Sequence, residues 1–129
     1  MPLKQALEKE HGLIQAHMGR IAQHHNHPFA ALNSLWMEDG ILLYVPSDCH
    51  LEKPIHCLFY SPAGTEPQAC YPRLLIVLEP GAQAQLVEEY LASPRLEQKH
   101  GAPNFTDSIT EVVLAKGARL THFKLLREN

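Results

Sequence analysis

The sequence predicts a mainly β fold, a parallel β-helix (solenoid) of stacked coils, preceded by an N-terminal α-helical segment. Three observations indicate this class. Apolar residues recur at helical spacing up to residue 23, short apolar runs follow residue 28, and two of these runs repeat at an offset of 36 residues. A period of this size with a turn at a fixed place is typical of solenoids and propellers. Short strands and tight corners favour the β-helix.

The composition fits one globular domain. The chain has 129 residues, of which 45% are hydrophobic and 19% are charged. Its net charge of −3 excludes the basic surface that nucleic acids and anionic membranes require. The longest apolar runs, such as residues 74–78, are too short to cross a bilayer. No signal-peptide core follows Met1, so a cytoplasmic location is expected.

Residues 3–23 are predicted to be helical. Gly12 interrupts the pattern and is a point where the helix can split. Residues 24–28 end the helix, because the residue before Pro28 is pushed out of the α region. We therefore expect a helical segment over 1–27 and a β-helix core, truncated at its C-terminal end, over 28–129. The apolar positions that carry the helical pattern are Leu3, Leu7, Ile14, Met18 and Ile21.

Every element after residue 28 is predicted to be a short strand. Each apolar run has five to seven residues, is rich in Leu, Ile, Val and aromatic residues, and is flanked by Gly, Pro, Asp or Asn. No run shows a helical stripe of ten or more residues. The runs are 41–45, 55–60, 74–78, 84–90, 109–114 and 120–126.

The repeat explains why the coils would stack. Gly81-Ala82 and Gly117-Ala118 follow equivalent strands, and Asp48-Cys49 fits the same place loosely, at an offset of about 33 residues. Glycine permits a positive φ at such a corner, and a small neighbour lets the turn pack inside a tight bend. The apolar face of one coil is buried only by its neighbours, which gives parallel sheets around a narrow core.

An ordered set of segments over residues 28–129 resembles the SufB/SufD family of iron–sulfur cluster assembly proteins. The segments are FAALN (29–33), DG (39–40), YVP (44–46), LEKPIH (51–56), PRLLIV (72–77), GA (81–82), VEEY (87–90), NFTD (104–107), TE (110–111) and HFKLLRE (122–128). The SufD branch fits better, because SufB-like chains are expected to carry N-terminal cysteine pairs that this sequence lacks.

This resemblance implies a right-handed parallel β-helix and a non-catalytic scaffold role. It implies a SufB-like subunit and a SufC-like ATPase as partners, and a cluster associated with the full assembly rather than with this segment. The chain is shorter than the family's usual members and has no counterpart of their C-terminal part. No functional residue is therefore carried over, and the sequence is either a fragment or a shortened relative.

A few side chains are candidates for chemistry. His24, His25 and His27, beside Asn26, form the densest group of potential metal ligands, although a solvated linker is the favoured interpretation. The three cysteines contain no Cys-x-x-Cys pair, so a zinc site is disfavoured and reduced, mostly buried thiols are expected. These cysteines are Cys49, Cys57 and Cys70.

Histidines and carboxylates in the strand region are expected to be structural. His50, His56 and His122 are predicted to be surface or hydrogen-bonded core residues, since a ligand role requires the coils to align them. Glu88 and Glu89 are expected to point to opposite faces of a strand and to lie on a solvated edge. Two further glutamates, Glu111 and Glu128, are isolated in sequence.

Nothing in the sequence indicates an enzyme, because the common hydrolase, phosphate-loop and zinc-protease motifs are absent. Two alternatives to the scaffold are a plain β-solenoid protein-binding module and a cupin-type metal-binding barrel. The barrel is disfavoured because its paired histidines belong on a strand, whereas His25 and His27 precede the first strand. An uncapped last coil also predicts a homodimer or higher oligomer through its C-terminal edge.

Overall fold

A computed structural model describes residues 1–127 except 24, 26, 39, 63–65 and 93–101. Within that part of the chain, three short helices precede eight strands. The helices are α1 (Leu3–Lys9), α2 (His11–His17) and α3 (Pro28–Trp36). The strands are β1 (Gly40–Val45), β2 (Ile55–Ser61), β3 (Gln68–Cys70), β4 (Arg73–Leu78), β5 (Gln83–Ala92), β6 (Asn104–Thr106), β7 (Ile109–Leu114) and β8 (Arg119–Arg127).

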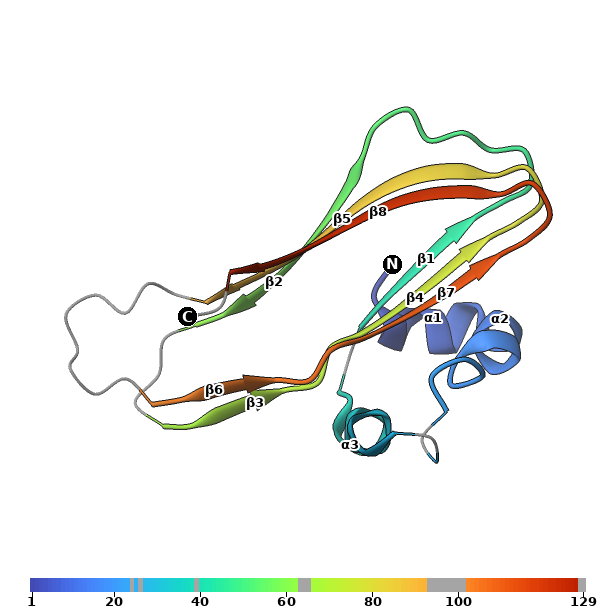
Figure 1. The fold of residues 1–129 in the computed structure, drawn as a ribbon. Coiled ribbons are helices and arrows are strands. Elements are labelled where there is room, and N and C mark those ends of the chain that lie inside the picture. The colour runs from blue at the N-terminus through green and yellow to red at the C-terminus, as the bar shows by residue number, and fades with distance from the viewer. Residues whose placement is uncertain (24, 26, 39, 63–65, 93–101, 128–129) are drawn as a thin grey trace.

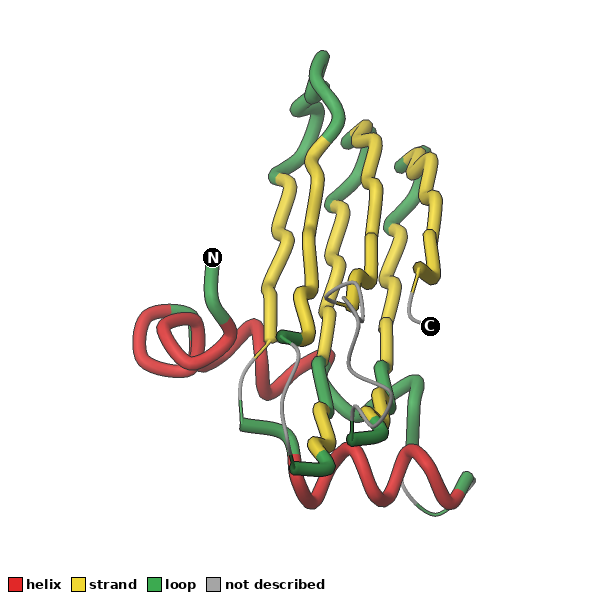
Figure 2. Tube along the Cα trace, turned by 90° about the vertical axis from the view of Figure 1, so that its left-hand side faces the viewer, coloured by secondary structure: helices red, strands yellow, loops and turns green. Residues whose placement is uncertain are grey.

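The strands form three parallel sheets that the chain visits in turn. Sheet A has the order β1-β4-β7, sheet B has β2-β5-β8, and sheet C has β3-β6. All pairings between these strands are parallel. The chain passes from A to B to C and returns to A, so each round lies beside the previous one (Figures 1 and 2). This path is consistent with a β-helix-like fold, and parallel pairing excludes an antiparallel cupin-type barrel.

The predicted strands and their period are confirmed. All six apolar runs are strands, and Val77 pairs with Val113, which is the predicted offset of 36 residues. Two strands, β3 and β6, escaped prediction because each has only three residues.

The corner turns follow the repeat as well. Asp48, Gly81 and Gly117 occupy one corner in successive coils, with φ values of 57°, 73° and 75°. The amide of Asp48 donates to the Pro80 carbonyl at 2.9 Å, and the amide of Gly81 donates to the Lys116 carbonyl at 3.1 Å. Each corner is thus bonded to the next, and aspartate is among the few non-glycine residues that tolerate a positive φ.

The N-terminal helix is only partly as predicted. It divides at Glu10 rather than Gly12, and α2 ends at His17 instead of continuing to residue 23. The reason is tertiary: the amides of Gly19, Ile21 and Ala22 donate to the Glu111 carboxylate and not to helix carbonyls.

The prediction of strands alone after residue 28 is wrong, because residues 28–36 form α3. Pro28 ends the preceding segment but also suits the first turn of a helix, where its missing N–H is not needed. The side chain of His27 caps this helix by accepting the amide of Phe29 at 3.3 Å.

Two apolar layers position the sheets. Inside the coils, residues such as Leu74, Ile76 and Leu86 form the main core. On the outer face of sheet A, α1 and α2 pack Leu3 and other side chains against that sheet (Figure 1). Strand β4 is therefore buried on both faces along its whole length.

Candidate functional site

Inside the coils, Glu88 on β5 has a fully buried carboxylate that contacts four polar side chains of the described residues. Tyr90 Oη donates to Glu88 Oε1 at 2.6 Å, and Thr110 Oγ1 lies 3.0 Å from both carboxylate oxygens. His122 Nε2 lies 2.8 Å from Oε2, and Lys124 Nζ lies 3.1 Å from Oε1. We call these five residues the Glu88 cluster. It joins β7 of sheet A to β5 and β8 of sheet B.

The cluster keeps Glu88 ionised. Burial by itself would raise the pKa of Glu88, but the hydrogen bonds from Tyr90, Lys124 and Thr110 and the charge of Lys124 outweigh it and hold that pKa below its ordinary value. Cys57 pairs with Glu88 in the register of β2 and β5. Burial, and then the Glu88 charge, raise the pKa of the Cys57 thiol, so this thiol is in its unreactive protonated form at neutral pH.

The prediction that Glu88 and Glu89 point to opposite faces is confirmed, but the predicted solvated edge is wrong. Glu89 is 7% exposed on the outer face of sheet B. There it contacts His56 Nε2 at 2.7 Å and Arg127 at 3.3 Å. The adjacent coils cover both carboxylates, which a single strand cannot reveal.

The two strand histidines that contact carboxylates serve separate groups. His122 points inward to Glu88, as expected of a hydrogen-bonded core histidine, and His56 points outward to Glu89. His50 is exposed and forms a bridge with Gln83. The coils therefore do not align His56 and His122 on a common ligand.

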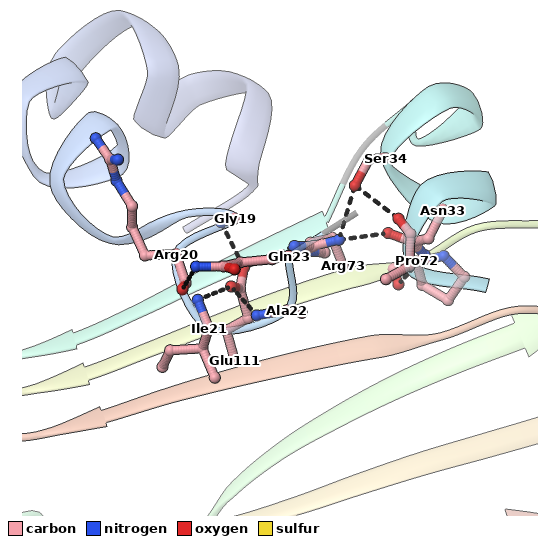
Figure 3. A network of polar contacts seen from close by, with 11 residues as sticks. Gly19, Arg20, Ile21, Ala22, Gln23, Asn33, Ser34, Pro72, Arg73 and Glu111 are labelled. Carbon is pink, nitrogen blue, oxygen red and sulfur yellow. Dashed lines mark hydrogen bonds and ion pairs between the residues drawn. The ribbon is translucent and has the colours of Figure 1, made fainter. Parts of the chain in front are cut away.

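A second buried network fastens the N-terminal segment and α3 to sheet A (Figure 3). Glu111 accepts three amides from residues 19–22 and pairs with Arg73 at 2.8 Å. Arg73 also donates to Asn33 Oδ1 at 3.0 Å, and Asn33 donates to the carbonyls of Pro72 and Asp107. We call Asn33, Arg73 and Glu111 the Arg73 network.

Burial would raise the pKa of Glu111, but the Gly19 amide, Arg73 and the Ala22 amide together lower that pKa. Glu111, isolated in the sequence, is therefore an ionised anchor. Asn33, Arg73 and Glu111 belong to three different segments of the family resemblance. No spacing along the sequence indicates that they meet.

Of the three histidines considered as metal ligands, the structure describes His25 and His27 but not His24. His24 and Asn26 lie outside the described residues, as does Glu128. His25 and His27 are exposed, and the Nδ1 atom of His27 is used to cap α3. Among the residues that the structure describes, no three His, Cys, Asp or Glu side chains gather as a metal site would require. In the same part of the chain, no helix is long and apolar enough to span a membrane.

Two family models match the sequence, one after the other along the chain. The family model described as "SufBD protein N-terminal region" matches residues 1–57, and the model described as "SUF system FeS cluster assembly, SufBD core domain" matches residues 59–129. A search of the solved structures found no match.

Curated relatives come from a cyanobacterium and a plant. An iron–sulfur cluster assembly SufBD family protein of Synechocystis sp. is 30% identical over 106 residues, which are 81% of this chain and 23% of that protein. Protein ABCI7, chloroplastic, of Arabidopsis thaliana is 27% identical over 106 residues, 78% of this chain and 21% of that protein. The Arabidopsis iron–sulfur cluster assembly SufBD family protein ABCI8, chloroplastic, is 29% identical over 121 residues, 93% of this chain and 20% of that protein.

The chain thus spans about a fifth to a quarter of the length of these relatives. The two family models together cover nearly every residue of the chain. The first ends at residue 57 and the second begins at residue 59, so the boundary between them lies within β2. The chain belongs to the SufBD family of iron–sulfur cluster assembly proteins.

Proposed function

We propose that the chain is all or part of a SufD-like scaffold subunit of the SUF machinery, and that it is not itself catalytic. Family membership over residues 1–57 and 59–129 carries this proposal. The SufD-like assignment extends the resemblance over residues 28–129 to one branch of the family. The buried carboxylates of Glu88 and Glu111 each accept several hydrogen bonds from described residues, as suits structural residues.

We further propose that the fold is a right-handed parallel β-helix. Support comes from the repeated passage through three parallel sheets, because parallel strand–crossover–strand connections are almost always right-handed. Strands β7 and β8 each have one strand neighbour among the described residues, so within that part of the chain each is the edge strand of its sheet. Such edges pair readily with another strand.

In this scheme the edge of the last coil is the contact surface. It would pair with further coils, a SufB-like subunit or a second copy of the chain, and a SufC-like ATPase would join the complete assembly. The iron–sulfur cluster is the cargo of that assembly and is not bound by this segment alone. We place the assembly in the cytoplasm.

The test is co-expression of the tagged chain with a SufB-like subunit and a SufC-like ATPase, followed by size-exclusion chromatography with light scattering. We expect a complex that contains the SufB-like subunit. Leu126→Lys, which adds a charge to edge strand β8, should weaken that complex. Tyr44→Lys is the matched control, because the β1 edge is already covered by Pro2.

A plain β-solenoid binding module is the competing function. It predicts self-association through the same edge but no association with the SufB-like subunit or the ATPase. A chain that remains a monomer at high concentration and binds neither subunit would refute both the scaffold role and the edge contact.

A further inference from the structure

The outer face of sheet B is an exposed, largely apolar surface. On sheet A, α1 and α2 cover the corresponding side, whereas Leu58, Tyr60 and Phe123 of sheet B are 52%, 57% and 58% exposed. Alternate residues of a strand point to the same face, and the register places these three on the face where Glu89 lies. Exposed apolar surfaces rimmed by polar residues are typical of protein–protein contacts.

The strand register arranges this face in three rows. We call its residues the sheet B face: His56 with Phe123, Leu58 and Leu125 on either side of Glu89, and Tyr60 with Arg127. Each end row therefore joins a base to an aromatic ring, and the two bases lie at opposite corners. Glu89 pairs with both bases from the centre, and its side chain is only 9% exposed, compared with 53% for His56 and 64% for Arg127. The groups that protrude are thus bases, rings and leucines, and the carboxylate lies beneath them.

We propose that the sheet B face binds the same face of a second copy of the chain. A two-fold axis parallel to β5 places β2 of one copy over β8 of the other, as in two aligned sheets packed face to face. Arg127 of each copy then meets the Tyr60 ring of the other, and His56 meets the Phe123 ring. Aromatic faces attract cations, and arginine stacks on them readily. A second copy is the occupant because it supplies a ring for each base of this face.

The middle row completes the contact. Leu58 of each copy packs on Leu125 of the other, and Glu89 faces Glu89. Each of these carboxylates already pairs with Arg127 of its own copy, so the contact holds equal numbers of carboxylates and guanidinium groups.

The size of the face sets the strength of the contact. Three strands about 4.8 Å apart, each with seven residues of about 3.3 Å, give a footprint of roughly 14 by 23 Å, about 330 Å². A standard interface buries about 800 Å² on each partner. The dimer is therefore expected to be weak.

Sedimentation velocity tests the contact in the Leu126→Lys chain, over concentrations from about 10 µM to about 1 mM. Leu126→Lys weakens the edge contact of the last coil, so the self-association that remains reports on the sheet B face. We expect a monomer–dimer equilibrium with a Kd of about 0.1 mM. This result does not depend on the scaffold role.

Variants in the same background locate the contact. Leu58→Lys places a charge in the middle row on β2, away from the edge strands β7 and β8, and should raise the Kd at least about ten-fold. Leu35→Lys is the matched control, because Leu35 is 75% exposed on α3, and it should leave the Kd unchanged. Circular dichroism checks that each variant is folded.

Isotope-filtered NMR on a mixture of labelled and unlabelled chains identifies the residues that meet. We expect nuclear Overhauser effects between the Tyr60 ring of one copy and the Arg127 side chain of the other. A Leu126→Lys chain that remains monomeric at about 1 mM would overturn the proposal, and so would a dimer that Leu58→Lys leaves intact.

Discussion

Replacing Glu111 with alanine is expected to destabilise the whole fold. The substitution leaves Arg73, which is 1% exposed, buried without its carboxylate partner, and it removes the acceptor of the Gly19, Ile21 and Ala22 amides. Breaking a buried ion pair by removing one partner costs about 3–5 kcal/mol.

The parent stability sets the scale for this loss. At about 0.05–0.15 kcal/mol per residue, a chain of 129 residues has an unfolding free energy of about 6–19 kcal/mol. Glu111→Ala therefore removes a large share of it, and a loss of about 4 kcal/mol raises the unfolded fraction about a thousand-fold.

Urea unfolding followed by circular dichroism measures the change, and hydrogen exchange at the amides of residues 19–22 locates it. We expect a lower urea midpoint and faster exchange at these amides. Glu8→Ala, on the exposed face of α1, is the matched control and should change the unfolding free energy by less than about 0.5 kcal/mol.

A double-mutant cycle separates the ion pair from simple packing. Arg73→Met combined with Glu111→Met should be less destabilised than the sum of the two single variants, because the double variant avoids an unpaired buried charge, although the amides of Gly19, Ile21 and Ala22 still lack their acceptor. If Glu111→Ala stays within about 1 kcal/mol of the parent chain, the Arg73 network does not anchor the N-terminal segment.

Three further outcomes follow from the same contacts. Gly117→Ala should lower the free energy of unfolding by about 1–2 kcal/mol, because the φ of Gly117 is 75°. Gly12→Ala should raise it by up to about 1 kcal/mol, because Gly12 lies in helix α2 with open space around it. Equal effects of the two substitutions in urea unfolding would contradict this reasoning. The pKa values of Glu88 and Glu111 are lowered on folding, so their contribution to stability is present above the ordinary carboxyl value of 4.5 and is lost as the pH falls below it. Glu88→Gln should flatten this acid limb of a stability–pH profile, and an unchanged profile would refute the assignment. Because its thiol is buried, Cys57 should react with iodoacetamide more slowly than the half-buried Cys49 and Cys70. Mass spectrometry of the labelled peptides measures the three rates, and equal rates would contradict burial of the Cys57 thiol.

The sequence by itself determined the six longer strands, their period and their corners. These features are local, since an apolar run of six residues, a following turn and a residue that tolerates positive φ lie next to one another in the chain. The alternation of a strand also separated Glu88 from Glu89 correctly. Likewise, the repeat identified Asp48 as the counterpart of Gly81 and Gly117.

Only the tertiary structure decided what covers each polar side chain. Glu111 meets the Gly19 amide across 92 residues of sequence, and Glu88 meets His122 across 34. The alternation of side chains along a strand predicts the face of the sheet to which each side chain points. Whether water or protein covers that side chain depends on the neighbouring coil. For the same reason α2 ends at His17: the amides beyond it are bonded by a carboxylate that a distant strand supplies.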